Sequence, residues 1–170
     1  LSPPRKRIAQ YARTSLRRWQ NSPPHPSFPS GKGTPFAYRR RLHKSPNKWQ
    51  GQGPNLYAIT PRLAPTSTPK QKKKAGQLKA EYPDVYVHTH LSENKNEVAW
   101  VKDLFPAQKG YLDVYHHYGL TGSRSVFAHC VHLEEAEWDC MHATDSAIAF
   151  CPTSNLFLGS GLFPLQKTWD

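Results

Sequence analysis

The chain has 170 residues, enough for one ordinary domain, and it carries a formal net charge of +11 at pH 7. The sequence contains neither a run of apolar residues long enough to span a membrane nor a visible secretory signal, which excludes a transmembrane helix and gives no support for export. Because the first residue is not Met and the sequence stops abruptly, we expect a fragment of a longer protein.

The charge is unevenly distributed along the chain. Residues 1–80 hold 18 Lys/Arg and no acidic residue, whereas residues 81–170 hold 5 Lys/Arg and 12 Asp/Glu. Residues 1–50 also contain 8 prolines and show no helical or strand periodicity, so they cannot bury enough apolar surface to offset the entropy of ordering. We therefore predict that residues 1–50 are a disordered or mistranslated segment and that residues 51–170 form the folded domain.

Several interpretations of the basic segment remain open. Its Lys/Arg clusters would attract phosphate, as in a nucleic-acid-binding or nuclear-localisation arm. Its Arg- and Ser-rich composition is also typical of transit peptides, although the prolines would break a long amphipathic helix. A plain disordered tail and an out-of-frame translation fit the same composition. Nucleic-acid binding ranks last among the functions, because few aromatic residues are interleaved for base stacking.

From Gly51 onward, apolar runs alternate with amphipathic segments. We predict strands over 55–60, 85–90, 125–130 and 146–151, and helices from Ser67-Thr68-Pro69 to about Tyr82 and over 93–105, 111–118 and 133–141. This spacing is that of βα units with buried parallel strands. We therefore expect an α/β fold, a partial (β/α)8 TIM-type barrel of about four βα units. A doubly wound open sheet is the alternative, although it would more usually have a Gly-rich first turn.

Periodicity also predicts which side chains face inward. The helix over 93–105 would turn Val98, Val101, Leu104 and Phe105 toward the core. The run Lys72–Lys74 is predicted to be a solvated helix face. Residues 152–155 are predicted to be a polar loop, in which Asn155 shapes the loop and takes no part in the reaction, and 159–161 a flexible link.

Side chains that can do chemistry stand at the ends of three successive predicted strands: Arg62, His90 with Glu93, and His129. The carboxyl ends of barrel strands are where ligands collect. A neutral imidazole that can bind a metal, near a carboxylate that can move protons, is what a metal-activated hydrolase needs. Taken alone, the His88-Thr89-His90 pattern is more often a hydrogen-bonded core pair, and Arg62 is as readily a solvated surface residue.

The three cysteines are Cys130, Cys140 and Cys151. Their odd number and the lack of C-x-x-C spacing fit free thiols in a reducing compartment better than a secreted disulfide scaffold. We therefore expect a cytoplasmic protein.

Four stretches are specific in combination. They are Tyr57–Arg62, His88–Asn94, Phe127–Cys130, and Cys151–Asn155 with Gly159–Gly161. Together they resemble the guanine deaminase family of the amidohydrolase superfamily over about residues 48–170. The resemblance implies a zinc-dependent hydrolase on a (β/α)8 barrel, with one zinc ion, that converts guanine and water to xanthine and ammonia in purine catabolism. It also implies a homodimer for the full-length family.

The resemblance assigns a role to each candidate residue. The metal ligands would be His90 and His129, and the catalytic residues would be Glu93, which shuttles the proton, and His129. The substrate contacts would be Arg62, Leu63, His90 and Glu93, with Leu63 standing where the family usually has phenylalanine.

The sequence also departs from the family pattern. The family takes two zinc histidines from an H-x-H on its first strand and an aspartate from its eighth, but residues 1–50 contain only His25 and His43, at no such spacing. Because catalytic zinc needs about three protein ligands, we expect the isolated chain to be inactive and to bind zinc poorly. The alternatives are an amidohydrolase that acts on another amino-substituted heterocycle, and a basic nucleic-acid-binding protein acting through residues 1–50.

Overall fold

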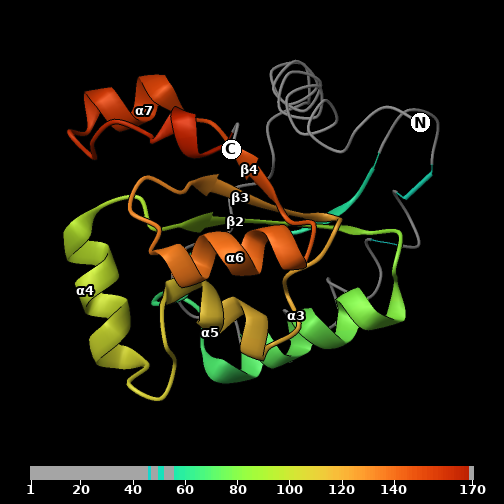
Figure 1. Ribbon diagram of the computed structural model, residues 1–170. Helices are drawn as coiled ribbons and strands as arrows, with labels where there is room; N and C mark the ends of the chain where they lie inside the picture. Colours follow the sequence, from blue (N-terminus) through green and yellow to red (C-terminus); the bar gives the residue numbers. More distant parts are fainter. Residues whose placement is uncertain (1–45, 47–49, 52–55, 169–170) are drawn as a thin grey trace.

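The computed structural model describes Pro46, Gln50, Gly51 and residues 56–168 (Figure 1). The prediction for residues 1–50 therefore lies outside the described part of the chain, except at Pro46 and Gln50. Among the described residues, no helix is both long and apolar enough to cross a membrane.

Four parallel strands form one sheet. They are β1 (Ala58–Ile59), β2 (Tyr86–Leu91), β3 (Ser125–His129) and β4 (Ala147–Ala149), and they lie side by side in chain order. A doubly wound sheet reverses its order at a switch point, whereas barrel strands follow one another without reversal. The α/β fold with parallel strands is thus confirmed, and the strand order favours a barrel segment.

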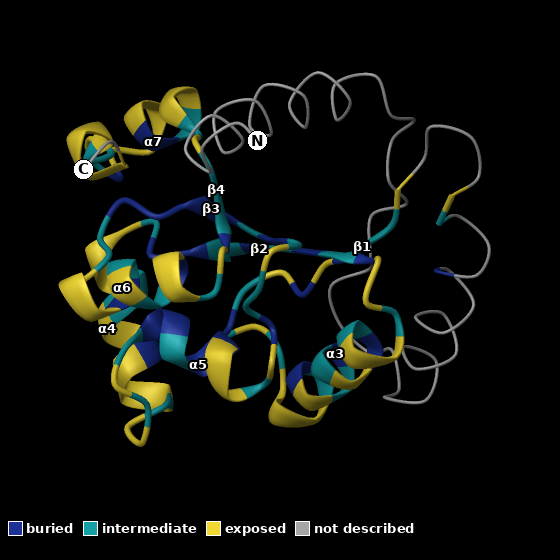
Figure 2. Cartoon of the chain, turned by 45° about the vertical axis from the view of Figure 1, so that its right-hand side comes forward, coloured by how far each residue is buried: buried dark blue, intermediate teal, exposed yellow. Residues whose placement is uncertain are grey.

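Helices connect the strands and cover the sheet. They are α3 (Pro69–Glu81), α4 (Lys95–Leu104), α5 (Tyr111–His117), α6 (Glu135–Ala143) and α7 (Pro152–Phe157), followed by a short 3-10 turn, η1 (Leu165–Thr168). Helices α3 to α6 lie on one side of the sheet, and α7 lies beyond the end of β4 (Figure 1). The core fills the space between the sheet and these helices, with buried residues concentrated on the strands and on α5 (Figure 2).

Local signals explain why α3 begins where it does. The hydroxyl oxygen of Thr68 accepts a hydrogen bond from the backbone N–H of Gln71, and the Gln71 side chain accepts one from the N–H of Thr68. Pro69 occupies the first turn, where its missing N–H costs nothing. This capping box confirms the predicted helix start.

The prediction of a solvated lysine face on α3 is wrong for Lys72. Lys73 is exposed, but the Lys72 side chain is fully buried. Its ammonium group donates to the carbonyl oxygens of Ala64, at 2.9 Å, and of Ser67. Buried charges need such partners, so Lys72 ties α3 to the loop that follows β1.

Two further expectations are corrected. Leu104 is 47% exposed, because a turn of 3.6 residues places it about 90° from the centre of the stripe formed by Val98, Val101 and Phe105. Residues 152–155 are not a loop but open α7, with Pro152 in the first turn.

Candidate functional site

The candidate site is built on the carboxyl end of β2. Burial alternates along the strand: Val87, Thr89 and Leu91 are buried, and His88 and His90 are half-buried on the opposite face. This is the two-residue period of a strand with one face against the core. The side chains of both histidines therefore point away from the helix-covered face of the sheet, as their spacing of two residues predicts.

Three of the predicted site residues come together at this edge of the sheet. The rings of His90 and His129 stack with their centroids 5.4 Å apart and their planes at 22°. Oε1 of Glu93 lies 3.6 Å from Nδ1 of His129. The parallel register explains the meeting, since it pairs His90 with Ala128 and Leu91 with His129. The catalytic and metal-binding roles of the three side chains stay predictions.

The Arg62 residue takes part through its backbone. Its carbonyl oxygen lies 2.8 Å from Nδ1 of His90 and 3.1 Å from the hydroxyl oxygen of Thr89. A carbonyl oxygen only accepts hydrogen bonds, so Nδ1 of His90 carries the proton and the lone pair is on Nε2. The Arg62 side chain is exposed and Leu63 is partly buried, so the predicted contacts of these two residues with a base stay predictions.

Asn155 was missed as a partner of the site. It is 1% exposed, and its amide oxygen lies 2.7 Å from Nδ1 of His129, from which it accepts a hydrogen bond. Its amide nitrogen is buried without a hydrogen-bond partner. The signal that could have revealed it is Pro152, because a helix beginning there turns Asn155 back toward the sheet.

The backbone at the strand ends is held in an unusual conformation. Ser92, His129 and Cys130 have φ angles of 48°, 74° and 53°, in the left-handed region that non-glycine residues rarely adopt. The carbonyl oxygen of Ser92 accepts hydrogen bonds from the N–H groups of Val131 and His132, both at 3.1 Å. The segments that leave β2 and β3 are thus fastened together, and such strain is concentrated at functional sites.

A second carboxylate supports Glu93. Oε2 of Glu97 accepts the backbone N–H of Glu93 at 3.3 Å, and Oε1 of Glu97 accepts the hydroxyl proton of Tyr111 at 2.6 Å. Glu93 itself has a buried oxygen, Oε1, that makes no hydrogen bond. A buried carboxylate oxygen without a hydrogen bond is costly, and it is the kind of group that a bound ligand or water molecule would satisfy.

Burial keeps the neighbouring His88 side chain neutral. Burial, reinforced by the nearby His90 and His129 rings, lowers the pKa of His88 to about 4. Among residues 56–168, no group of three or more His, Cys, Asp or Glu side chains is arranged to hold a metal ion. The donor set at the site still suits zinc in kind, because the free lone pair of His90 is an imidazole ligand and the Arg62 carbonyl fixes its tautomer.

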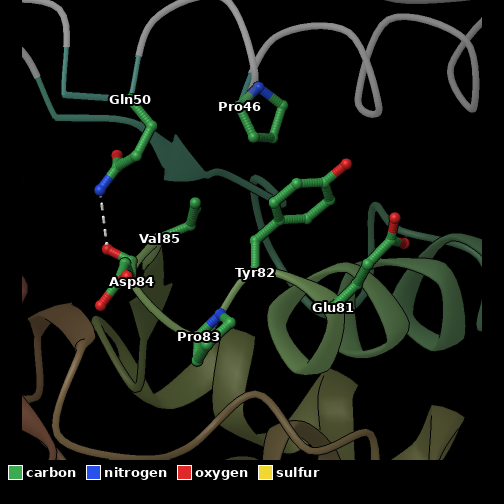
Figure 3. Close-up of a pocket in the computed structure, with 7 residues that line it drawn as sticks. All are labelled: Pro46, Gln50, Glu81, Tyr82, Pro83, Asp84 and Val85. Carbon is green, nitrogen blue, oxygen red and sulfur yellow. Dashed lines mark hydrogen bonds between the residues drawn. The ribbon is translucent and has the colours of Figure 1, made fainter.

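A separate hollow of about 320 Å³ lies at the opposite end of the sheet (Figure 3). It is lined by Pro46, Gln50, Glu81, Tyr82, Pro83, Asp84 and Val85. Among the lining residues, the Gln50 side chain donates to the Asp84 carbonyl oxygen at 3.0 Å (Figure 3). Because these residues precede β2 whereas His90 lies near the end of that strand, the hollow is not part of the candidate site.

Comparisons with known proteins show the family and the fold of the chain. A model of the amidohydrolase family matches residues 10–170. Guanine deaminase of Escherichia coli strain K12 is 67% identical over 123 residues, which is 72% of this chain and 28% of that protein. The solved E. coli guanine deaminase has a TM-score of 0.77 and 61% identity, with 79% of this chain and 31% of that one covered.

Two more distant structures share the fold. Guanine deaminase from C. acetobutylicum, solved with guanine bound in its active site, has a TM-score of 0.73 and 32% identity over 77% of this chain and 32% of that one. An adenosine deaminase from Xanthomonas campestris with bound zinc has a TM-score of 0.72 and 25% identity over 79% of this chain and 30% of that one. The chain therefore spans less than a third of the length of these relatives.

Proposed function

The chain belongs to the amidohydrolase family, and from this premise we propose that its residues 51–170 form part of the barrel of a zinc-dependent guanine deaminase. Such an enzyme hydrolyses guanine to xanthine and ammonia in purine catabolism. The observation that carries the proposal is the convergence of His90, Glu93 and His129 at one edge of the sheet, in a chain that is 67% identical to a guanine deaminase over 123 residues.

Each residue has a task in the proposed reaction. His90, through Nε2, and His129 are the ligands that this chain would offer to zinc. When bound, zinc supplies Lewis-acid activation of water at neutral pH. Glu93 takes a proton from the attacking water, passes it to the ring nitrogen of guanine and assists the departure of ammonia. Oε1 of Glu93, which makes no hydrogen bond, is the atom that would carry this proton.

The remaining residues hold groups in place. Asn155 holds the ring of His129 through Nδ1, so the remaining nitrogen, Nε2, would serve in one of two roles: as a zinc ligand, or in a hydrogen bond to the tetrahedral centre that forms at the substrate carbon. The Arg62 guanidinium is a fork of donors suited to the purine carbonyl, and Leu63 offers an apolar contact to the base. The Arg62 carbonyl orients His90 at the same time, so one residue serves both substrate and ligand.

We further propose that the 170 residues alone do not turn over guanine. Catalytic zinc sites use about three protein ligands, and His90 with His129 supplies two. The proposed setting is the cytoplasm, where the thiols of Cys130, Cys140 and Cys151 would stay free, as they are in the structure. By the same resemblance, the complete enzyme is proposed to be a homodimer.

A chimera tests the function directly. Residues 56–168 would replace the matching segment of E. coli guanine deaminase, which then supplies the rest of the barrel. We expect the zinc-loaded chimera to form xanthine from guanine, which is measured by absorbance. We also expect treatment with a chelator to abolish this activity. The isolated chain is the negative control, and the E. coli enzyme is the positive one.

The same experiment can reject the proposal. A folded, zinc-loaded chimera without turnover on guanine would refute it. A chimera that prefers another amino-purine, a pyrimidine or a triazine would move the assignment to a different specificity within the amidohydrolase family.

A further inference from the structure

A buried tyrosine of α5 reaches the candidate site from the packed side of the sheet. The Tyr115 side chain is fully buried; its ring stacks on that of Tyr111, with centroids 5.7 Å apart, and meets that of Phe127 at a tilt, with centroids 5.5 Å apart. The aromatic ring alone would be enough to pack against these two neighbours. The hydroxyl group, however, is placed 2.9 Å from the carbonyl oxygen of His90 and 3.1 Å from the hydroxyl oxygen of Thr89. Burial raises the pKa of Tyr115, so the phenol keeps its proton.

These contacts reach His90 by two routes. In the first, the Tyr115 hydroxyl donates directly to the backbone carbonyl oxygen of His90. In the second, which uses the same proton and is therefore an alternative to the first, the Tyr115 hydroxyl donates to Thr89. Thr89 then donates to the Arg62 carbonyl oxygen at 3.1 Å, and that oxygen accepts from Nδ1 of the His90 ring at 2.8 Å. One buried hydroxyl cluster therefore reaches both the backbone and the ring of His90, and the Tyr115 proton serves one of the two routes at a time. A satisfied buried network of this kind fixes geometry more firmly than its separate bonds would.

We propose that Tyr115 is a positioning residue of the site: through Thr89 and the Arg62 carbonyl, its hydroxyl keeps the His90 ring in the Nδ1–H tautomer, with Nε2 presented to a ligand. The functional role of this positioning rests on the proposed function, because the orientation of Nε2 matters only if that atom binds a metal. The positioning itself can be measured without metal, substrate or activity. A failure of the deaminase proposal would therefore leave this test intact, and the reverse also holds.

The test uses the full chain labelled with ¹⁵N at histidine. Long-range ¹H–¹⁵N spectra, recorded at a pH where histidine is neutral, report the tautomer of each ring through the shifts of Nδ1 and Nε2. We expect His90 of the parent chain to be mainly Nδ1–H. In Tyr115→Phe, which keeps the packed ring and removes only the hydroxyl, we expect the ratio of the two tautomers to fall by roughly three- to tenfold, the bias that one buried hydrogen bond provides.

The matched control is Val114→Ala. Val114 is also buried on α5, but its side chain carries no polar atom and takes no part in the His90 network. This variant should lose comparable stability and leave the His90 shifts unchanged. Equal changes in both variants, or none in Tyr115→Phe, would show that Tyr115 only fills the core. A parent His90 that is mainly Nε2–H would overturn the inference outright.

A second pair of variants protects the test against a failure to fold. If Tyr115→Phe loses its folded spectrum, the same chain of hydrogen bonds can be tested at Thr89. Thr89→Val removes the hydroxyl in the middle of that chain, and Thr89→Ser keeps it. We then expect mixed tautomers in Thr89→Val and the parent tautomer in Thr89→Ser. Identical His90 shifts in these two variants would overturn the proposal.

Discussion

The ammonium nitrogen of Lys72 lies 4.5 Å from the centroid of the Phe105 ring, so a charge of α3 is enclosed beneath the end of α4. Desolvation lowers the pKa of Lys72 from 10.5 to about 8. The unfolded chain therefore binds more protons between these two values, and the folded state gains stability as the pH rises through them. That stability is lost again as the pH falls to about 8.

Substituting this lysine tests the assignment. In Lys72→Met we expect the pH dependence of the urea unfolding midpoint between about 8 and 10.5 to become shallower than in the parent chain. Lys73→Met, at the exposed neighbouring position, is the control and should keep the parent slope. Parallel curves for the parent and Lys72→Met would show that Lys72 is not the group that titrates.

Glu93→Gln should separate proton transfer from folding. In the chimera with the E. coli enzyme, we expect kcat on guanine to fall by about 100- to 10,000-fold, the usual contribution of a positioned general acid or base. The amide keeps the shape of the side chain, so the unfolding midpoint should change little. Glu135→Gln is the matched control, because Glu135 is exposed on α6. Unchanged turnover in Glu93→Gln would contradict the assigned role.

Asn155→Leu tests how much the hydrogen bond between Asn155 and His129 contributes to stability. The substitution removes the amide that lies 2.7 Å from Nδ1 of His129 and leaves that buried nitrogen unsatisfied. We expect a loss of about 1–3 kcal/mol in the free energy of unfolding, measured with urea. Asn96→Leu, at an exposed position of α4, should stay within about 0.5 kcal/mol of the parent. Equal stability for the two variants would mean that the Asn155 contact contributes nothing.

Gly76→Ala should be destabilising although alanine is the better helix former. A Cβ atom at position 76 would stand 1.8 Å from the carbonyl oxygen of Tyr118, a backbone atom that cannot rotate away. Such overpacking costs about 1–3 kcal/mol or more, against a propensity gain of about 1 kcal/mol. Thermal unfolding decides the sign, with Gln77→Ala on the exposed face of α3 as the control. A Gly76→Ala chain more stable than the parent would refute this close approach.

Local signals made the regular elements predictable. Thr68 and Pro69 mark the start of α3, and the alternation in β2 marks its buried face. The meeting of His90 with His129 followed from the rule that parallel strands end at one edge of the sheet. In each case the residues that carry the information are close in sequence, or are related by a rule of topology.

What the sequence could not reveal depends on contacts between distant segments. The burial of Lys72 needs the Phe105 ring, which belongs to a different helix connection, and the carbonyl oxygen of Ala64, a backbone atom that no residue pattern marks. The orienting atom of Arg62 is a backbone oxygen, which every residue possesses and no pattern distinguishes. The Pro152-Thr153-Ser154 composition is typical of a loop, so the helix that delivers Asn155 was hidden.

The left-handed turns at Ser92, His129 and Cys130 limit how this protein can change over evolutionary time. Side chains branched at Cβ collide with the backbone in that conformation, so Val, Ile and Thr should be absent from these positions in any descendant that keeps the site, whatever their chemistry. Glycine adopts this conformation without strain, but an asparagine amide at 130 would be buried in the hydrophobic core. The substitutions accepted at the two strand ends are therefore limited by the left-handed backbone conformation as much as by what the side chains can bind.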